Sequence, residues 1–254
     1  MGEQVVKSVL LTNGSSHGQS ILRALQSRDL APDAIVIERA RRDRLRELRR
    51  SLRKYGVWET AADVIAFIRR RVAVLGAAAA PFRYGDYAAR VITVADLNSS
   101  ETVEEIARLA PDLLLLGGCR ILRRPVLATA RMAVLNGHPG RLPDYRGVDV
   151  ISWAIYNGER PSVTIHKVNE GVDTGEVISQ RDLRWEPGDD IDTIRRKAEL
   201  LAAEMMADAV AAVGREGRVK GLPQPSGAGK QYYRMPRALR REVNCKLKAT
   251  WQSP

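Results

Sequence analysis

Residues 5–18 read VVKSVLLTNGSSHG, an apolar run that ends in a glycine- and serine-rich turn. A short run rich in leucine and β-branched residues predicts a buried strand. After the turn, Ile21, Leu22 and Leu25 share one face of a predicted helix, and a second apolar run, AIVIE, follows at 34–38. The order strand, turn, helix, strand predicts an α/β fold built on an open sheet of parallel strands.

The rest of the chain continues this alternation. Further strands are expected at 91–94, 113–117, 132–136, 162–168 and 176–183. Helices are expected at about 100–110, 148–156 and 190–213. Serine and aspartate accept hydrogen bonds from the free N–H groups of a helix start, so we expect Ser99 or Ser100 and Asp190 or Asp192 as caps. The pattern favours a twisted, mostly parallel sheet with helices on both faces.

Positive charge is concentrated in two segments. The chain has 254 residues and a formal net charge of +11, but residues 39–71 and 218–248 each carry a net +8. The remaining residues therefore carry a net −5. Basic segments of this kind suit a nucleic acid, a nucleotide or an anionic membrane surface.

These segments divide the chain into a domain at 1–215, a basic helical hairpin inserted at about 41–75, and a basic C-terminal extension at 216–254. Two apolar stripes at helical spacing predict the hairpin. It is expected to be a solvated helical pair on the sheet edge, while contact with a polyanion, a substrate or a membrane surface is the alternative. The glycine- and proline-rich extension is expected to wrap the surface.

Composition excludes several classes of protein. The two cysteines, Cys119 and Cys245, exclude a disulfide framework and a cysteine-based zinc site. The longest apolar run, at 72–82, is too short to span a bilayer, and the N-terminus lacks the pattern of a secretory signal. We therefore expect a cytoplasmic protein without a metal.

Asn136 ends the strand expected at 132–136, and His138 follows two residues later. In extended backbone both side chains point to the same face, and ends of parallel strands line the ligand crevice of such sheets. An amide that donates to an oxyanion, beside an imidazole that exchanges protons near neutral pH, suits acyl transfer. A polar strand end that satisfies loop backbone groups is the alternative.

Two later segments supply further candidates. The loop LPDYRG at 142–147 would close over the strand end. Asp173 lies in a glycine-flanked turn at 171–175, after the strand that carries His166. A carboxylate there can raise the pKa of an imidazole and orient it. An Asx turn at Asp173 and a purely structural His166 are the alternatives.

Together, NGHPGRLPDYRG at 136–147 and VTIHKVNEGVDTGEVISQ at 163–180 resemble the folate-dependent formyltransferases. This family includes phosphoribosylglycinamide, methionyl-tRNA and sugar N-formyltransferases. The resemblance is strong over about 113–183, weaker over 5–38 and absent from the basic insertion. It implies a Rossmann-like sheet with the site at the strand ends, 10-formyltetrahydrofolate as donor and an amine as acceptor.

The resemblance also implies residue roles by motif position. Asn136, His138 and Asp173 correspond to the catalytic trio, in which the amide and a protonated imidazole stabilise an oxyanion and the carboxylate positions the imidazole and a water. Folate contacts are expected from Cys119, Arg120, Ile121, Leu122 and Val172. Substrate contacts are expected from Asn13, Gly14, His17, Tyr145, Arg146 and His166.

Two departures from the family bear on the acceptor. The N-terminal loop lacks the serine–asparagine–leucine signature of the glycinamide enzyme, and too few residues follow Val213 for the C-terminal barrel of the methionyl-tRNA enzyme. We expect an N-formyltransferase acting on a primary amine of a small anionic metabolite, with an amino-sugar nucleotide as the leading choice.

Other functions and partners stay open. The alternatives are formylation of an aminoacyl-tRNA, a carrier-bound amino acid or glycinamide ribonucleotide, and a non-catalytic binding module of the same fold. Nucleic acid is a disfavoured partner, and a peripheral contact with an anionic membrane stays open. The sequence is compatible with a homodimer and gives no indication of oligomeric state.

Overall fold

A computed structural model describes residues 6–39 and 81–252, with scattered positions between 49 and 65. The chain divides into two compact units, of which residues 40–83 form the smaller and all other residues the larger. Apart from those scattered positions, the helical hairpin expected at about 41–75 lies outside the described residues. The fold and the candidate site described below belong to the larger unit.

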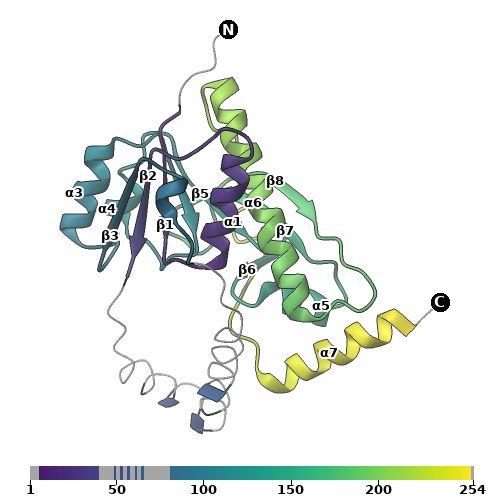
Figure 1. Cartoon of the computed structure of the whole chain (residues 1–254). Coiled ribbons are helices and arrows are strands. Elements are labelled where there is room, and N and C mark those ends of the chain that lie inside the picture. Colours follow the sequence, from purple (N-terminus) through teal and green to yellow (C-terminus); the bar gives the residue numbers. More distant parts are fainter. Residues whose placement is uncertain are drawn as a thin grey trace. The chain divides into compact units, whose positions relative to one another are not determined.

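A seven-stranded sheet in the order β3-β2-β1-β4-β5-β7-β8 forms the centre of the larger unit (Figure 1). Its strands are β1 (Ser8–Thr12), β2 (Ala34–Glu38), β3 (Arg90–Val94), β4 (Leu113–Gly117), β5 (Ala133–His138), β7 (Ser162–Lys167) and β8 (Val177–Asp182). Strands β3, β2, β1, β4 and β5 are parallel, whereas β7 runs antiparallel to both β5 and β8. The predicted open, mostly parallel sheet is confirmed.

Burial explains why the central strands read as unbroken apolar runs. Every residue of β1, β2 and β4 is buried, because helices cover both faces of a parallel sheet. On one face, Ile106 and Val126 from two helices join Val9 and Leu11 of β1 in a single apolar cluster. On the other face, Gly137 of β5 lies so close to a helix that a Cβ atom there would be 3.0 Å from the Cβ of Ala202.

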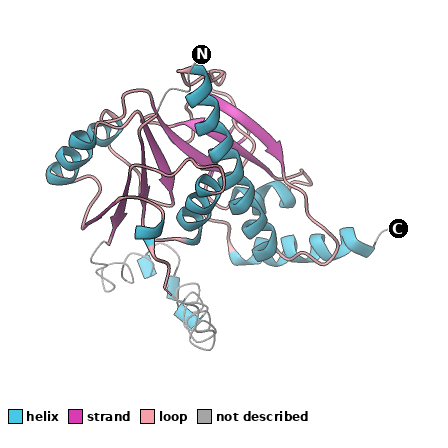
Figure 2. Ribbon diagram, turned by 45° about the horizontal axis from the view of Figure 1, so that its top comes forward, coloured by secondary structure: helices cyan, strands magenta, loops and turns pink. Residues whose placement is uncertain are grey.

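Helices lie on both faces of the sheet (Figure 2). They are α1 (Ser16–Gln26), α3 (Ser100–Leu109), α4 (Arg124–Leu127), α5 (Val150–Tyr156), α6 (Ile191–Glu216) and α7 (Arg237–Gln252), with a short 3-10 turn, η1, at Tyr84–Asp86. Helices α1 and α6 pack against each other, and α3 and α4 cover the opposite face of the sheet. Ser99 and Asp190 accept hydrogen bonds from Thr102 N–H and Thr193 N–H, so these two predicted caps are confirmed.

The segment after α6 follows the body of the larger unit closely, and we call residues 217–236 the C-terminal strap. Leu222 and Val177 exchange two backbone hydrogen bonds of 2.8 Å. Further along, β9 (Lys230–Tyr232) pairs in parallel with β6 (Tyr145–Gly147), and α7 then packs on α5. The sequence predicted that this segment wraps the surface, but it gave no sign of β9 or α7.

Among the residues that the structure describes, no helix is both long and apolar enough to cross a bilayer.

The centre of the sheet should be the most sensitive place for stability. Leu114 of β4 is fully buried, so Leu114→Ala removes packed methyl groups and leaves a cavity. We expect it to lower the free energy of unfolding by about 2–5 kcal/mol in urea denaturation. Leu200→Ala is the matched control, because Leu200 is 55% exposed, and it should cost less than about 1 kcal/mol. Equal losses in the two variants would contradict this description of the core.

Candidate functional site

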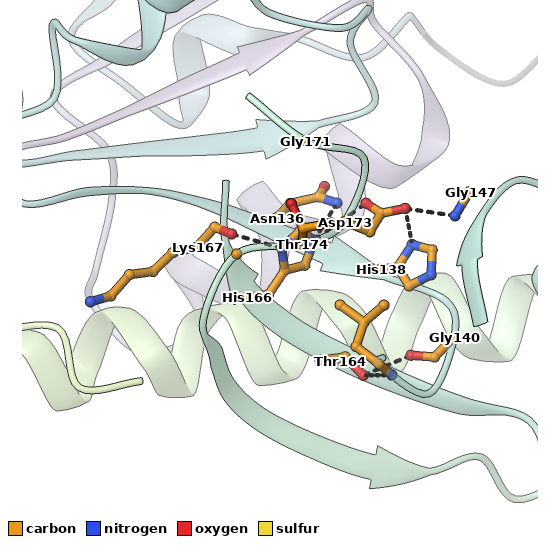
Figure 3. A network of polar contacts seen from close by, with 12 residues as sticks. Asn136, His138, Gly140, Gly147, Thr164, His166, Lys167, Gly171, Asp173 and Thr174 are labelled. Carbon is orange, nitrogen blue, oxygen red and sulfur yellow. Dashed lines mark hydrogen bonds and ion pairs between the residues drawn. The ribbon is translucent and has the colours of Figure 1, made fainter. Parts of the chain in front are cut away.

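The end of β5 and the neighbouring strand β7 bring the polar candidates together. The antiparallel register sets Asn136 opposite His166 and His138 opposite Thr164. Asn136 Nδ2 lies 3.2 Å from His166 Nε2, and the two imidazole rings meet edge to face with centroids 6.2 Å apart. The alternation of side chains along the two strands therefore places Asn136, His138, Thr164 and His166 on one side of the sheet (Figure 3).

His138 is 3% exposed and lies between two acceptors. Its Nε2 is 2.7 Å from the carbonyl oxygen of Tyr145, and its Nδ1 is 3.4 Å from Asp173 Oδ2. A neutral imidazole has one N–H and can donate to only one of these partners, whereas an imidazolium donates to both. Both ring nitrogens of His138 therefore face oxygen atoms that can accept a hydrogen bond.

Asp173 has an unusual backbone and a well-held side chain. Its φ is +53°, in the left-handed region that side-chain-bearing residues rarely adopt. Its Oδ2 accepts the N–H of Gly147 at 2.8 Å, and its Oδ1 lies 3.6 Å from His166 Nε2 (Figure 3). The carboxylate thus lies close to two imidazoles and accepts one main-chain N–H, and only 16% of the side chain is exposed.

His166 is held as a neutral ring with a defined tautomer. Its Nδ1 donates to the carbonyl of Lys167 at 2.8 Å, which leaves Nε2 to accept from the Asn136 amide. Burial lowers the pKa of His166 to about 4, and the charge of His138 acts in the same direction while Asp173 opposes both. A neutral His166 fixes the orientation of the Asn136 amide and leaves one amide N–H and Oδ1 for other partners.

The loop after His138 is tied to β7. The hydroxyl of Thr164 donates to the carbonyl of Gly140 at 2.6 Å and accepts from Gln180 Nε2 at 2.9 Å. A Cβ atom at position 140 would lie 2.6 Å from His138 Nε2 and 2.7 Å from Tyr145 O. Gly140 is therefore required for the loop to pass this close to the imidazole.

Tyr145 and Arg146, both expected to contact substrate, lie on β6. Tyr145 enters the site through its carbonyl oxygen, while its ring stacks on Tyr232 with centroids 5.0 Å apart. Arg146 Nη2 donates to the carbonyl of Gly229 at 3.4 Å, and its Nε is buried without a partner among the described residues. Neither side chain makes a hydrogen bond to Asn136, His138 or Asp173.

The segment expected to hold folate follows β4. Arg120 pairs with the buried Glu38 at 2.8 Å and with Asp96 at 3.2 Å, so its guanidinium is engaged within the fold. Burial raises the pKa of the Cys119 thiol to about 12, which makes it inert as a nucleophile. Leu122 is buried in the apolar cluster under the sheet.

Ile121 and Val172 remain available to a ligand. Ile121 is 82% exposed and Val172 is 38% exposed. An ion pair of 3.5 Å between Arg124 and Glu170 joins the two loops that carry them. Two exposed apolar side chains beside main-chain polar groups fit a flat heteroaromatic ring such as a pterin.

The N-terminal loop satisfies most of its own N–H groups. Gly14 N–H donates to Thr12 Oγ1 at 3.0 Å, and Ser15 N–H donates to Asn13 Oδ1 at 3.0 Å. Burial lowers the pKa of His17, and both of its ring nitrogens lack a partner among the described residues. Asn13, Gly14 and His17 lie at the end of β1, on the same edge of the sheet as the other candidates but not bonded to Asn136, His138 or Asp173.

Sequence reasoning missed several residues that shape this site. Thr164 and Gln180 hold the loop after His138, and Gln224 of the C-terminal strap donates to the carbonyls of Asp173 and Gly175. Thr164 could have been found, because it lies two residues before His166 on the same strand face. Gln224 stands between two prolines in an irregular segment, where no local pattern indicates a contact.

The protonation of His166 provides a test of this geometry. We expect its ring signals in NMR to stay those of the neutral Nδ1–H tautomer from about pH 8 to about pH 5.5. Asp173→Asn removes the charge that raises the pKa of His166, so this pKa should fall further. The unfolded chain takes up this proton near pH 6.5, so the site should reduce the free energy of unfolding as pH falls from 6.5 to about 4. A ring that becomes charged near pH 6.5 in the folded protein would contradict the arrangement.

Comparison with known proteins finds a protein family whose model matches most of the chain. A family model described as formyl transferase matches residues 6–210. A methionyl-tRNA formyltransferase from Caldanaerobacter subterraneus subsp. tengcongensis is 32% identical over 113 residues, which are 44% of this chain and 37% of that protein. The chain thus covers well under half of this relative.

Solved structures share the fold at low sequence identity. Glycinamide ribonucleotide transformylase 1 from Symbiobacterium toebii has a TM-score of 0.55 at 21% identity, over 87% of this chain and 96% of that one. The formyltransferase PseJ from Anoxybacillus kamchatkensis, in complex with UDP-4,6-dideoxy-4-formamido-L-AltNAc and tetrahydrofolate, has a TM-score of 0.52 at 17% identity, over 89% and 85%.

Proposed function

The chain belongs to the formyl transferase family, and from this premise we propose that it is an enzyme that moves a formyl group from 10-formyltetrahydrofolate to a primary amine. The observation that carries the proposal is the convergence of Asn136, His138 and Asp173 at the end of β5. Asn136 lies 3.2 Å from His166, and Asp173 lies 3.4 Å from His138 and 3.6 Å from His166. A module that only binds would have no use for an amide, an imidazole and a carboxylate held in this order.

When bound, 10-formyltetrahydrofolate supplies the activated formyl group. The segment from Cys119 to Leu122 would hold the pterin through its main chain, with Ile121 and Val172 as the apolar contacts. The exposed side chains of these two residues, on loops joined by the Arg124–Glu170 ion pair, fit that role. Metal-ligating clusters of three or more His, Cys, Asp or Glu side chains are not present among the described residues.

The chain's own groups have distinct tasks in this proposal. Asn136 offers its remaining amide N–H to the oxygen on which negative charge develops, and His166 keeps that amide oriented. His138 carries a proton on Nδ1, and Asp173 holds that proton and the ring in place. Because the site is almost closed to bulk water, these fixed dipoles and charges act at low dielectric.

The acceptor is proposed to be an amino group on a small anionic metabolite, with an amino-sugar nucleotide as the first choice. Support comes from the likeness to PseJ, whose structure holds a UDP-linked formamido sugar. The self-satisfied N–H groups of Gly14 and Ser15 argue against glycinamide ribonucleotide, which would need free donors for its phosphate at that loop.

A second candidate acceptor is an aminoacyl-tRNA. The specific observation in its favour is that the curated relatives with 30–38% identity are methionyl-tRNA formyltransferases. The strap and α7 carry basic residues that could contact phosphates. The matched stretches cover only 33–40% of those relatives, so most of each relative has no counterpart in the match.

The trio can be tested directly. His138→Ala and Asp173→Asn should each lower kcat by about 100-fold or more. Formyl transfer forms the amine–formyl C–N bond, breaks the folate–formyl C–N bond and moves a proton from the amine to the leaving folate nitrogen, and each variant removes a group proposed to hold a proton in this step. The assay follows the release of tetrahydrofolate, and circular dichroism checks the fold. Asp208→Asn is the matched control, since Asp208 is a half-exposed carboxylate of α6 that pairs with Arg28 and Arg181. Near-normal turnover in either variant would contradict the assignment of that residue to the catalytic trio.

The acceptor class can be decided by a competition between candidates. Several amino-sugar nucleotides and one aminoacyl-tRNA are offered with 10-formyltetrahydrofolate, and each active pair is repeated at about 50 and 200 mM salt. A sugar nucleotide should be formylated with little dependence on salt. A polyanion bound through many phosphates loses affinity steeply with salt, so a strongly salt-dependent reaction with tRNA alone would favour the second candidate.

A further inference from the structure

The C-terminal strap reaches the candidate site at two places. At its start, Leu222 bonds to Val177, the first residue of β8. At its end, β9 pairs with β6, and Gly147 of β6 lies opposite Tyr232. Gly147 is the residue whose N–H holds the carboxylate of Asp173. The strap therefore contacts both loops that meet at Asp173.

Between these two places, Gln224 contacts the turn that carries Asp173. Its Nε2 lies 3.0 Å from the carbonyl oxygen of Asp173 and 2.6 Å from that of Gly175. Two carbonyl acceptors require the NH₂ group on this side of the amide, so both of its hydrogens are used within the turn. Gln224 Oε1 is buried and has no partner among the described residues.

The turn needs such support because its backbone is costly. Asp173 has a φ of +53°, in the left-handed region, where a Cβ atom comes too close to the following carbonyl oxygen. On the N-terminal side, Asn169 Oδ1 accepts from Gly171 N–H at 3.1 Å and from the Thr174 hydroxyl at 2.8 Å. On the C-terminal side, the two bonds from Gln224 hold the carbonyls of Asp173 and Gly175.

The same strap fixes the partner of the Asp173 side chain. Gly147 has a φ of +98°, and a Cβ atom there would lie 2.2 Å from the carbonyl oxygen of Tyr232. Val148 N–H donates to that carbonyl at 3.1 Å. The position of the Gly147 N–H therefore depends on β9, and the position of the Asp173 main chain depends on Gln224.

We propose that Gln224 is a positioning residue for Asp173, and that the C-terminal strap is a structural part of the site. This inference rests on the proposed function, in which Asp173 holds the His138 proton. Gln224 acts only through Asp173: its amide fixes the turn, the turn aims the carboxylate, and the carboxylate holds His138. Loss of the Gln224 amide leaves Asn136, His138 and Asp173 present but no longer holds them at fixed distances and angles.

The test uses the full chain and three variants. Gln224→Met keeps the length of the side chain and removes both donors, and Gln224→Glu places a carboxylate against two carbonyls. Gln231→Met is the matched control, because Gln231 lies on β9 of the same strap with an exposed side chain. Melting temperature and circular dichroism establish that each variant is folded before any other reading is taken.

The first reading is independent of activity. Hydrogen exchange of the Gly147 amide reports whether the Asp173 carboxylate still accepts its hydrogen bond. We expect exchange at Gly147 to accelerate by about tenfold or more in Gln224→Met and further in Gln224→Glu, and to stay unchanged in Gln231→Met. Protection of Gly147 that is equal in all four proteins overturns the inference, whether or not a substrate is known.

The second reading uses formyl transfer. A loosened trio should lower kcat by about tenfold while KM for the folate and for the amine stays within about twofold, because binding groups are untouched. Equal kcat in wild type and in the folded Gln224→Met variant overturns the inference. If wild type transfers no formyl group to any amine offered, the proposed function fails, and the exchange at Gly147 still decides the role of Gln224.

Discussion

The carboxylate of Asp173 is the only acidic side chain that faces His138 and His166 in the described structure, and it faces both of them. One negative charge in a largely buried place can balance one positive charge but not two. Burial and the nearby ring of His138 keep His166 neutral, and both nitrogens of His138 face oxygen atoms. The neutral His166 in turn accepts from Asn136 and fixes its amide. The contacts around Asp173 thus connect His138, His166 and Asn136 in one network.

This network requires the backbone to come very close to itself. A Cβ atom at Gly175 would lie 1.8 Å from the carbonyl oxygen of Lys167, the oxygen that fixes the tautomer of His166. The glycines on either side of Asp173 were recognised in the sequence as a turn, but their packing role could be seen only in three dimensions. A side chain at Gly175 would separate the turn from β7, and one at Gly171 would collide with Thr174 within the turn.

The parts of the fold and of the site that could be predicted from the sequence are those that depend on residues close together in the chain. The apolar runs of β1 and β4, the caps at Ser99 and Asp190, and the pair Asn136 and His138 each follow from local spacing. The strap could not be predicted in the same way. Strand β9 has only three residues, and its role depends on a partner strand about eighty positions earlier in the chain. Gln224 likewise contacts a turn that precedes the whole of α6 in the sequence.

The basic charge of the C-terminal segment is partly committed to the fold. Lys220 pairs with Glu216 at 2.7 Å, Arg240 Nε donates to Met235 O at 2.9 Å, and Lys246 Nζ lies 4.5 Å from the centre of the Tyr156 ring. The first two contacts are local in the sequence, and the third attaches α7 to α5. The net +8 of residues 218–248 is therefore not a measure of free binding capacity.

In the sequence, helix α6 lies between β8 and the strap. Its length therefore determines where the strap begins. Its 26 residues span about 39 Å at 1.5 Å per residue. The helix ends at Gly217, which adopts the left-handed conformation with a φ of +65° and turns the chain back toward β8. Each residue of an α-helix advances the chain by about 100° around the axis, so one residue more or less would aim the strap in a different direction. The length of helix α6 thus determines the direction in which the strap leaves the helix toward the turn that carries Asp173.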